Sequence, residues 1–189
     1  MRNVTEKQVK EAKSQYLKFI FVRHPFSRLV SAYSDKFQIP AHRFEQAAVE
    51  YGNDLLRKNS DLTESDVFKY MNGHKYLIKI PTFKEFVNFI LETPMERLNN
   101  HWTSMTRRCQ PCAMDYDIIG KVETIEQDVA YITKKMNVSS AEFPHLNVSN
   151  STSRTKNYIT SLPVEIRYKL YDKFKDDFIM FSYTMEDYN

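Results

Sequence analysis

The stretch from Lys18 to Tyr33 constrains the fold of this chain more than any other segment. Residues 18–22 form an apolar, β-rich run that is too short for a helix and is followed at once by Arg23, His24 and Pro25. Pro25 suits the first turn of a helix, where its missing N–H is not needed. The sequence therefore predicts a buried strand that leads directly into a helix, the junction at which α/β proteins hold phosphate.

Side chains at this junction suit phosphate binding. Arg23 ends the strand, Arg28 follows in the helix, and Ser31 lies about two turns in. An arginine fork and a hydroxyl can hold one phosphate through charge-assisted hydrogen bonds of about 1.5–3 kcal/mol each. The alternative is a surface helix on which Arg23 pairs with an acidic residue. Only three glycines occur and no two are close, which excludes a Walker-type or GxGxxG loop and disfavours a cytosolic nucleotide kinase.

The rest of the pattern predicts a helix-rich α/β domain. A second short strand is expected over 115–120, and helices are expected over 25–39, 82–91, 124–136 and 162–174. Residues 95–114 and 137–157 have the composition of loops. Residues 41–80 mix helical patches, among them 43–57 and 63–71, with polar sequence, and we interpret them as a helical, polar insertion on the surface of one domain.

Composition limits the ligands. A chain of 189 residues with 42% hydrophobic residues suits one packed domain. A net charge of +3 without a long basic run does not indicate a nucleic-acid partner. Cys109 and Cys112 form a lone CxxC, which is compatible with half a zinc site, a redox pair or a structural disulfide. Zinc requires two further ligands, and no second CxxC or HxxxH follows, so no metal site is predicted.

Two features bear on the cellular compartment. Four N-glycosylation sequons occur, and together with the paired cysteines they favour a secretory compartment. No apolar run approaches the ~20 residues needed to span a bilayer. The candidate glycosylation sites are Asn3, Asn137, Asn147 and Asn150.

Several motifs carry a resemblance to a known family. Phe21–Tyr33, continuing to Phe37, resembles the 3′-phosphate-binding motif of Golgi carbohydrate sulfotransferases, in particular the chondroitin 4-O-, dermatan 4-O- and HNK-1 sulfotransferase branch. Further blocks are similar in the same order: Asn100–Trp102, Cys109–Thr124, Ser151–Thr155 and Leu170–Tyr183. The resemblance implies a P-loop-NTPase-like sulfotransferase fold with an incomplete central parallel sheet, of which residues 1–189 are the C-terminal part of a single domain.

The resemblance also implies a cofactor site. The sulfate donor is then 3′-phosphoadenosine 5′-phosphosulfate (PAPS), with Arg23 and Ser31 on its 3′-phosphate, Arg28 in support and Arg154 as a second phosphate contact. His24 stands where the motif more usually has an acidic residue. The family's 5′-phosphosulfate loop precedes this motif, and the 22 residues before Arg23 lack it. We therefore expect that loop, the stem and the membrane anchor to lie outside this chain.

The same resemblance implies the kind of acceptor and the residues that would act on it. It implies a glycan acceptor, with N-acetylgalactosamine of chondroitin or dermatan favoured, and a place on the lumenal side of the Golgi membrane. Among five histidines, His101 is the candidate catalytic base, because it adjoins Trp102, which can stack on a sugar ring; a packing corner is the alternative. Cys109 and Cys112 would have a structural role, bonded to each other or to a cysteine elsewhere. The rival function is an inactive fragment or pseudoenzyme that retains only the 3′-phosphate half-site.

Overall fold

A parallel pair of strands forms the small sheet of the predicted α/β fold. The computed structural model describes residues 5, 11, 15–138 and 151–188. β1 (Phe19–Val22) and β4 (Ile118–Lys121) pair in parallel, with Phe19 opposite Ile118 and Val22 opposite Lys121. Both predicted strands are therefore confirmed, together with the helix-rich α/β class and its small parallel sheet. The expectation that the first strand is buried holds only for Val22, because Phe19 is exposed and the two residues between them are half-buried.

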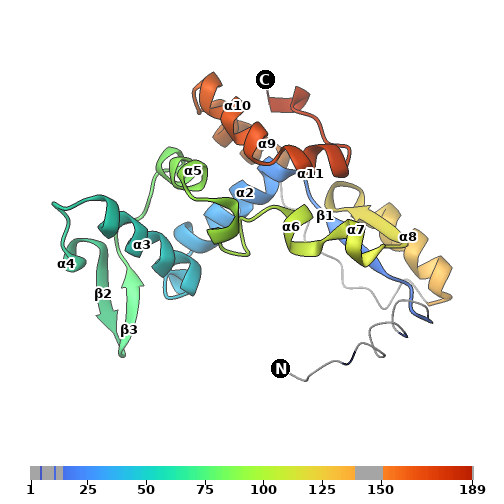
Figure 1. Cartoon of the computed structure of the whole chain (residues 1–189), viewed down its shortest axis with the longest axis horizontal. Helices are drawn as coiled ribbons and strands as arrows, with labels where there is room; N and C mark the ends of the chain where they lie inside the picture. The colour runs from blue at the N-terminus through green and yellow to red at the C-terminus, as the bar shows by residue number, and fades with distance from the viewer. Residues whose placement is uncertain (1–4, 6–10, 12–14, 139–150, 189) are drawn as a thin grey trace.

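The helix that follows β1 forms as the sequence predicts. α2 (Pro25–Tyr33) starts three residues after the strand, with Pro25 at its first position. It continues into a π-helical turn, η1 (Ser34–Gln38), and a 3-10 turn, η2 (Pro40–His42). Its buried face includes Phe26, Leu29 and Val30, so α2 runs through the middle of the molecule (Figure 1).

The segment 41–80 contains a β-hairpin that the sequence reading missed. It comprises α3 (Gln46–Lys58), α4 (Glu64–Val67), β2 (Phe68–Met71) and β3 (His74–Leu77), and the two strands pair antiparallel. Asn72 and Gly73 have φ of 50° and 79°, the left-handed conformation that a two-residue hairpin turn requires. The helix expected over 63–71 is therefore wrong beyond Val67, because the Asn-Gly turn and its flanking residues favour a hairpin.

The hairpin packs against α3 at a glycine. A Cβ atom on Gly52 would lie 2.3 Å from Cζ of Phe68, so the absence of a side chain lets the Phe68 ring approach the helix. Phe68 and Leu77 are buried and belong to the same hydrophobic core as α2. The apolar residues of this segment thus contribute to the main core.

Helices account for most of the remaining chain. α5 (Phe83–Glu92) confirms the helix expected over 82–91 and begins with a capping box in which Thr82 and Glu85 exchange hydrogen bonds. The stretch expected to be loop-like holds η3 (Met95–Arg97), α6 (Met105–Cys109) and α7 (Pro111–Met114). η4 (Val122–Thr124) leads into α8 (Ile125–Met136), which confirms the helix expected there.

The C-terminal helices cover α2. They are α9 (Ser151–Thr160), α10 (Val164–Lys173), α11 (Lys175–Met180) and the 3-10 turn η6 (Glu186–Tyr188). α9 corrects the expectation of a loop up to residue 157: its polar sequence is helical because it packs directly on α2. Figure 1 shows these helices on one side of α2, with α3 and the hairpin towards one end of the molecule and α8 towards the other. Within the described ranges, no helix is both long and apolar enough to cross a bilayer.

Candidate functional site

Arg23 stands where β1 ends and α2 is about to begin. Its Nε donates to Oγ of Ser27, in the first turn of α2, at 2.9 Å. In the part of the chain that the structure describes, no hydrogen bond engages the terminal nitrogens of its guanidinium. Burial lowers the pKa of Arg23 and the nearby Arg154 lowers it further, whereas Glu123 acts in the opposite direction. The side chain is thus held at one nitrogen and has donors left for a ligand.

A second arginine and a hydroxyl belong to the same corner. Arg154 lies in the first part of α9, the helix that packs on α2, and it is exposed. Its positive charge lowers the pKa of Arg23, so the two cations act on the same corner of the molecule. Ser31 follows Ser27 by four residues, so its hydroxyl lies on the same row of α2, one turn further on. Two arginines and a serine at a strand–helix junction can together hold a phosphate.

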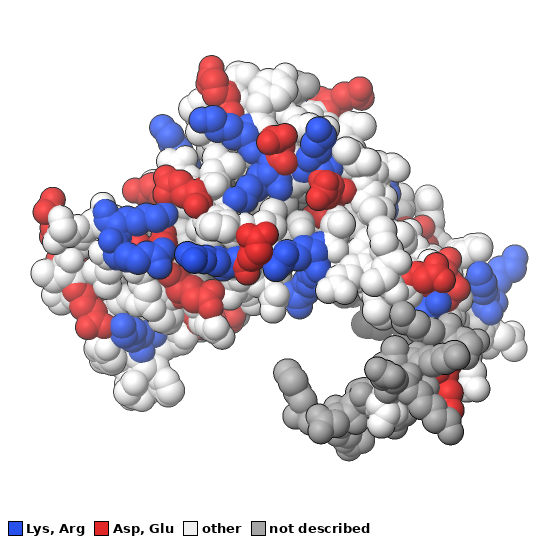
Figure 2. All heavy atoms as spheres, viewed as in Figure 1, with Lys and Arg blue, Asp and Glu red and all other residues white. Residues whose placement is uncertain are grey.

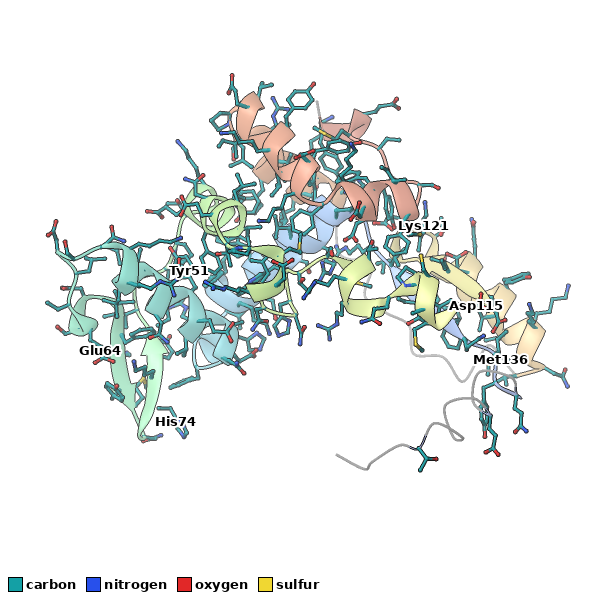
Figure 3. All side chains as sticks on the ribbon, viewed as in Figure 1. Tyr51, Glu64, His74, Asp115, Lys121 and Met136 are labelled. Carbon is teal, nitrogen blue, oxygen red and sulfur yellow. The ribbon has the colours of Figure 1, made fainter. Side chains whose placement is uncertain are left out.

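Glu123 ties the start of α2 to the C-terminal segment. Its Oε1 accepts from the backbone N–H of His24 at 2.8 Å, and its Oε2 accepts from the Tyr183 hydroxyl at 2.8 Å. Burial and the carboxylate of Glu123 raise the pKa of Tyr183, which therefore remains a hydrogen-bond donor. Lys121 lies over the Tyr183 ring, with Nζ 4.3 Å from its centroid, beside the C-terminal helices (Figure 3). Both carboxylate oxygens of Glu123 are thus used to support the junction.

His24 acts as the N-cap of α2. Its Nδ1 accepts from the backbone N–H of Phe26 at 3.2 Å, which places the ring proton on Nε2, facing the carbonyl of Thr184 at 2.9 Å. The ring is buried against aromatic side chains, among them Phe178 and Tyr183. The histidine therefore performs the capping function of the acidic residue that is more usual at this position.

Arg28 holds a turn. Its Nη1 donates to the carbonyl of Thr103 at 2.5 Å and its Nη2 to that of Asn100 at 3.3 Å. Burial lowers its pKa, and the nearby Asp177 acts in the opposite direction. Because carbonyls of the 99–104 turn occupy its guanidinium, we assign Arg28 to positioning that turn and do not retain the supporting phosphate role predicted from the sequence.

The 99–104 turn places His101 and Trp102 in different environments. Trp102 is 0% exposed and packs between Phe37 and Phe86, so its ring has no face open to a sugar. The packing-corner alternative therefore describes Trp102, and the stacking role does not fit its position. His101 is exposed, and its backbone N–H donates to Oδ1 of Asn99 at 3.1 Å.

Lys36, on η1, forms a charged network with Asp35 and Glu45. Nζ of Lys36 lies 2.7 Å from a carboxylate oxygen of Asp35 and 2.6 Å from one of Glu45, and it is almost fully buried. Burial and the Lys36 ammonium lower the pKa of His101, while Glu45 and Asp35 act in the opposite direction. A histidine that is neutral near pH 7 can accept a proton, which is what a catalytic base requires.

The remaining predicted sites are distributed as follows. Cys109 and Cys112 are free thiols, so the structure does not contain the internal disulfide, and burial raises the pKa of Cys109. Asn137 is exposed at the left-handed C-cap of α8. Asn3, Asn147 and Asn150 lie outside the described residues.

Sequence reasoning did not assign the supporting roles of three residues. Ser27 orients Arg23, and Glu123 and Tyr183 brace the junction from segments about 100 and 160 positions away. The i, i+4 spacing of Ser27 to both Arg23 and Ser31 is a signal that could have found the first. The other two depend on long-range contacts that no local pattern encodes.

Comparison with known proteins identifies the relatives of this chain. Residues 1–184 match the model described as "Sulfotransferase family". Carbohydrate sulfotransferase 12 of Xenopus laevis is 31% identical over 181 residues, covering 92% of this chain and 41% of the relative. Carbohydrate sulfotransferase 11 of Rattus norvegicus is 32% identical over 180 residues, covering 92% and 48%. Carbohydrate sulfotransferase 14 of Danio rerio is 30% identical over 190 residues, covering 98% and 48%.

The matched region includes the strand–helix junction that carries Arg23. The chain spans a little under half the length of these relatives. No solved structure matches it. With the family model matched along nearly the whole chain and Arg23 at the end of a parallel strand, this protein belongs to the sulfotransferase family.

Proposed function

We propose that this chain forms the 3′-phosphate-binding side of a PAPS-dependent carbohydrate sulfotransferase. The observation that supports it is the corner at the end of β1, where Ser27 orients Arg23. The positive charge of Arg154, on the helix that packs on α2, acts on the same guanidinium. The two guanidinium groups would bind the 3′-phosphate through charge-assisted hydrogen bonds, and the Ser31 hydroxyl would add a third contact.

The reaction would be an in-line transfer of a sulfuryl group. The bond between sulfur and the bridging oxygen of the donor breaks as a bond forms to a sugar hydroxyl, whose proton passes to a base. We assign the base to His101, in line with its lowered pKa. Arg23, Ser31 and Arg154 would fix the donor so that its sulfuryl group meets the acceptor in line.

For the acceptor, we propose N-acetylgalactosamine in chondroitin or dermatan. The relatives' names support a carbohydrate, and the resemblance of the motifs supports this particular sugar. The four sequons are consistent with a lumenal place in the Golgi, and we propose that any membrane attachment lies outside residues 1–189. A disulfide from Cys109 or Cys112 to a cysteine elsewhere in the protein would suit the same compartment.

A transfer assay tests this function. The longest natural form of the protein would be incubated with ³⁵S-labelled PAPS and a panel of desulfated chondroitin, dermatan and heparosan. We expect label in the chondroitin or dermatan fraction and a loss of about 10- to 100-fold in kcat/KM in Arg23→Ala, corresponding to one or two charged hydrogen bonds.

Arg107→Ala is the matched control, because Arg107 is an exposed arginine whose nearest acid, Glu96, is 3.9 Å away. Its activity should equal that of the wild type. If no glycan in the panel accepts label, the enzyme assignment is overturned. Nucleotide binding without transfer would favour the inactive half-site.

A further inference from the structure

A cavity of about 250 Å³ lies between α3, α5 and the segment that leads to the 99–104 turn. We infer that this cavity binds one sugar unit of an anionic acceptor glycan, next to the unit that is sulfated; the inference rests on the proposed function. The cavity is lined by Glu50, Asn53, Asp54, Arg57, Phe89, Thr93, Arg97 and Asn99.

The lining has the chemistry of a saccharide site. Phe89 offers an aromatic surface to the C–H face of a pyranose, while the Asn53 amide and the second N–H of the Asn99 amide can bond its hydroxyls. The Phe89 ring is fixed by edge contacts with Tyr51, which Figure 3 labels on α3, and with Trp102, at centroid distances of 5.3 and 6.2 Å. The buried Trp102 therefore supports the aromatic surface from behind.

The acidic groups of the cavity already have partners. Asp54 pairs with Arg57 and with Lys58, whose Nζ is 2.9 Å from Oδ2. Glu50 accepts from the amides of Asn99 and Gln46 at 2.8 and 2.7 Å. Asp54 is thus paired with two cations, whereas Glu50 keeps its charge and has both carboxylate oxygens engaged by amides of the protein.

Arg97 supplies the charge selectivity. It is exposed in the cavity lining, and among the described residues it has no ion-pair partner. Figure 2 shows Lys and Arg side chains in a row that crosses this face from α3 towards α6, with acidic side chains between them. A guanidinium without a counter-charge fits the carboxylate of a uronic acid or a sulfate group on a neighbouring sugar.

Asn99 connects the cavity to the proposed base. Its Nδ2 donates to Oε2 of Glu50 at 2.8 Å, and its Oδ1 accepts from the backbone N–H of His101 at 3.1 Å. A sugar bound at Asn99 therefore lies beside the residue that carries the imidazole. Arg28 fixes the same turn from α2, which links the cavity to the helix that carries Ser31.

Binding can be measured on the chain itself. A ¹H–¹⁵N spectrum would be recorded with unsulfated chondroitin hexasaccharide, with its 4-sulfated form and with a neutral dextran oligosaccharide. We expect both chondroitins to shift the signals of Asn53, Arg97 and Asn99, and dextran to shift them little. Arg97→Ala and Asn53→Ala should weaken chondroitin binding by about 5- to 30-fold.

Lys84→Ala provides the control, since Lys84 is an exposed cation on α5 outside the cavity. Unchanged binding in both cavity variants, or shifts that map elsewhere, would overturn the inference. Binding of adenosine 3′,5′-bisphosphate should be unaffected by Arg97→Ala. If the glycan binds at Arg97 but the nucleotide does not bind at all, the proposed function fails while the saccharide cavity stands.

Discussion

At the scale of single residues, the proposed nucleotide corner depends on how Arg23 is oriented. A serine one helical turn away fixes Nε and leaves the other guanidinium nitrogens for a ligand. The motif alone predicted Arg23 and Ser31 but not this division of donors. Arg28 shows the opposite case: its place in the motif suggested phosphate, whereas its contacts are with the backbone carbonyls of a turn.

The titration of His101 provides a residue-scale prediction. Its pKa lies below the ordinary 6.5 because of burial and then Lys36. A base must be neutral, and histidine is neutral above its pKa, so the lowered pKa keeps the imidazole active to lower pH. Arg108 lowers this pKa and Glu45 raises it, so Arg108→Gln should move the titration to higher pH and Glu45→Gln to lower pH.

Histidine ring signals followed by NMR as the pH is varied would measure both shifts, with His101→Gln identifying the signal. Shifts in the same direction for the two variants would contradict the electrostatic environment described here. In the active protein, the acid limb of the rate profile should move in the same two directions if His101 is the base.

At the scale of elements, the sequence predicted the helices and strands that are specified by neighbouring residues alone. The apolar run before Arg23 predicted β1, Pro25 the start of α2, and the helical pattern over 82–91 predicted α5; all three elements are confirmed. α9 was missed because its sequence is polar, and its helical form accompanies packing on α2. At the candidate site, the motif indicated Arg23, Ser31 and Arg154, whereas Glu123 and Tyr183 reach it only through the tertiary fold.

The contact between α3 and the hairpin gives a prediction at this scale. Alanine normally stabilises a helix relative to glycine by up to about 1 kcal/mol. At Gly52 the added Cβ would lie 2.3 Å from the Phe68 ring and 2.9 Å from Leu77, and overpacking of a core costs about 1–3 kcal/mol. Gly52→Ala should therefore lower the free energy of unfolding by about 1–2 kcal/mol.

This change in stability would be measured by denaturant unfolding, monitored by circular dichroism. Asn53→Ala is the control, because Asn53 is exposed on the same helix and the change should leave stability equal or slightly higher. Equal or greater stability of Gly52→Ala would show that the hairpin does not rest on α3 as described.

At the scale of the whole molecule, α2 connects the proposed functions. Its first turn holds Arg23 through Ser27, its middle carries Arg28, which positions the turn of His101, and its π-helical extension supplies Lys36. Contacts such as that between His24 and Thr184 bring segments 160 positions apart to the same helix. The proposed donor corner, the proposed base and the proposed saccharide cavity are therefore arranged around one element of the core.

Calorimetric titration of this chain with adenosine 3′,5′-bisphosphate tests the central claim, that the corner at the end of β1 holds a nucleotide 3′-phosphate. We predict binding that falls about 10- to 100-fold in Arg23→Ala and in Arg154→Ala and is unchanged in His101→Ala and Arg107→Ala. No binding by the folded wild-type chain, or binding that survives both Arg23→Ala and Arg154→Ala, would contradict it.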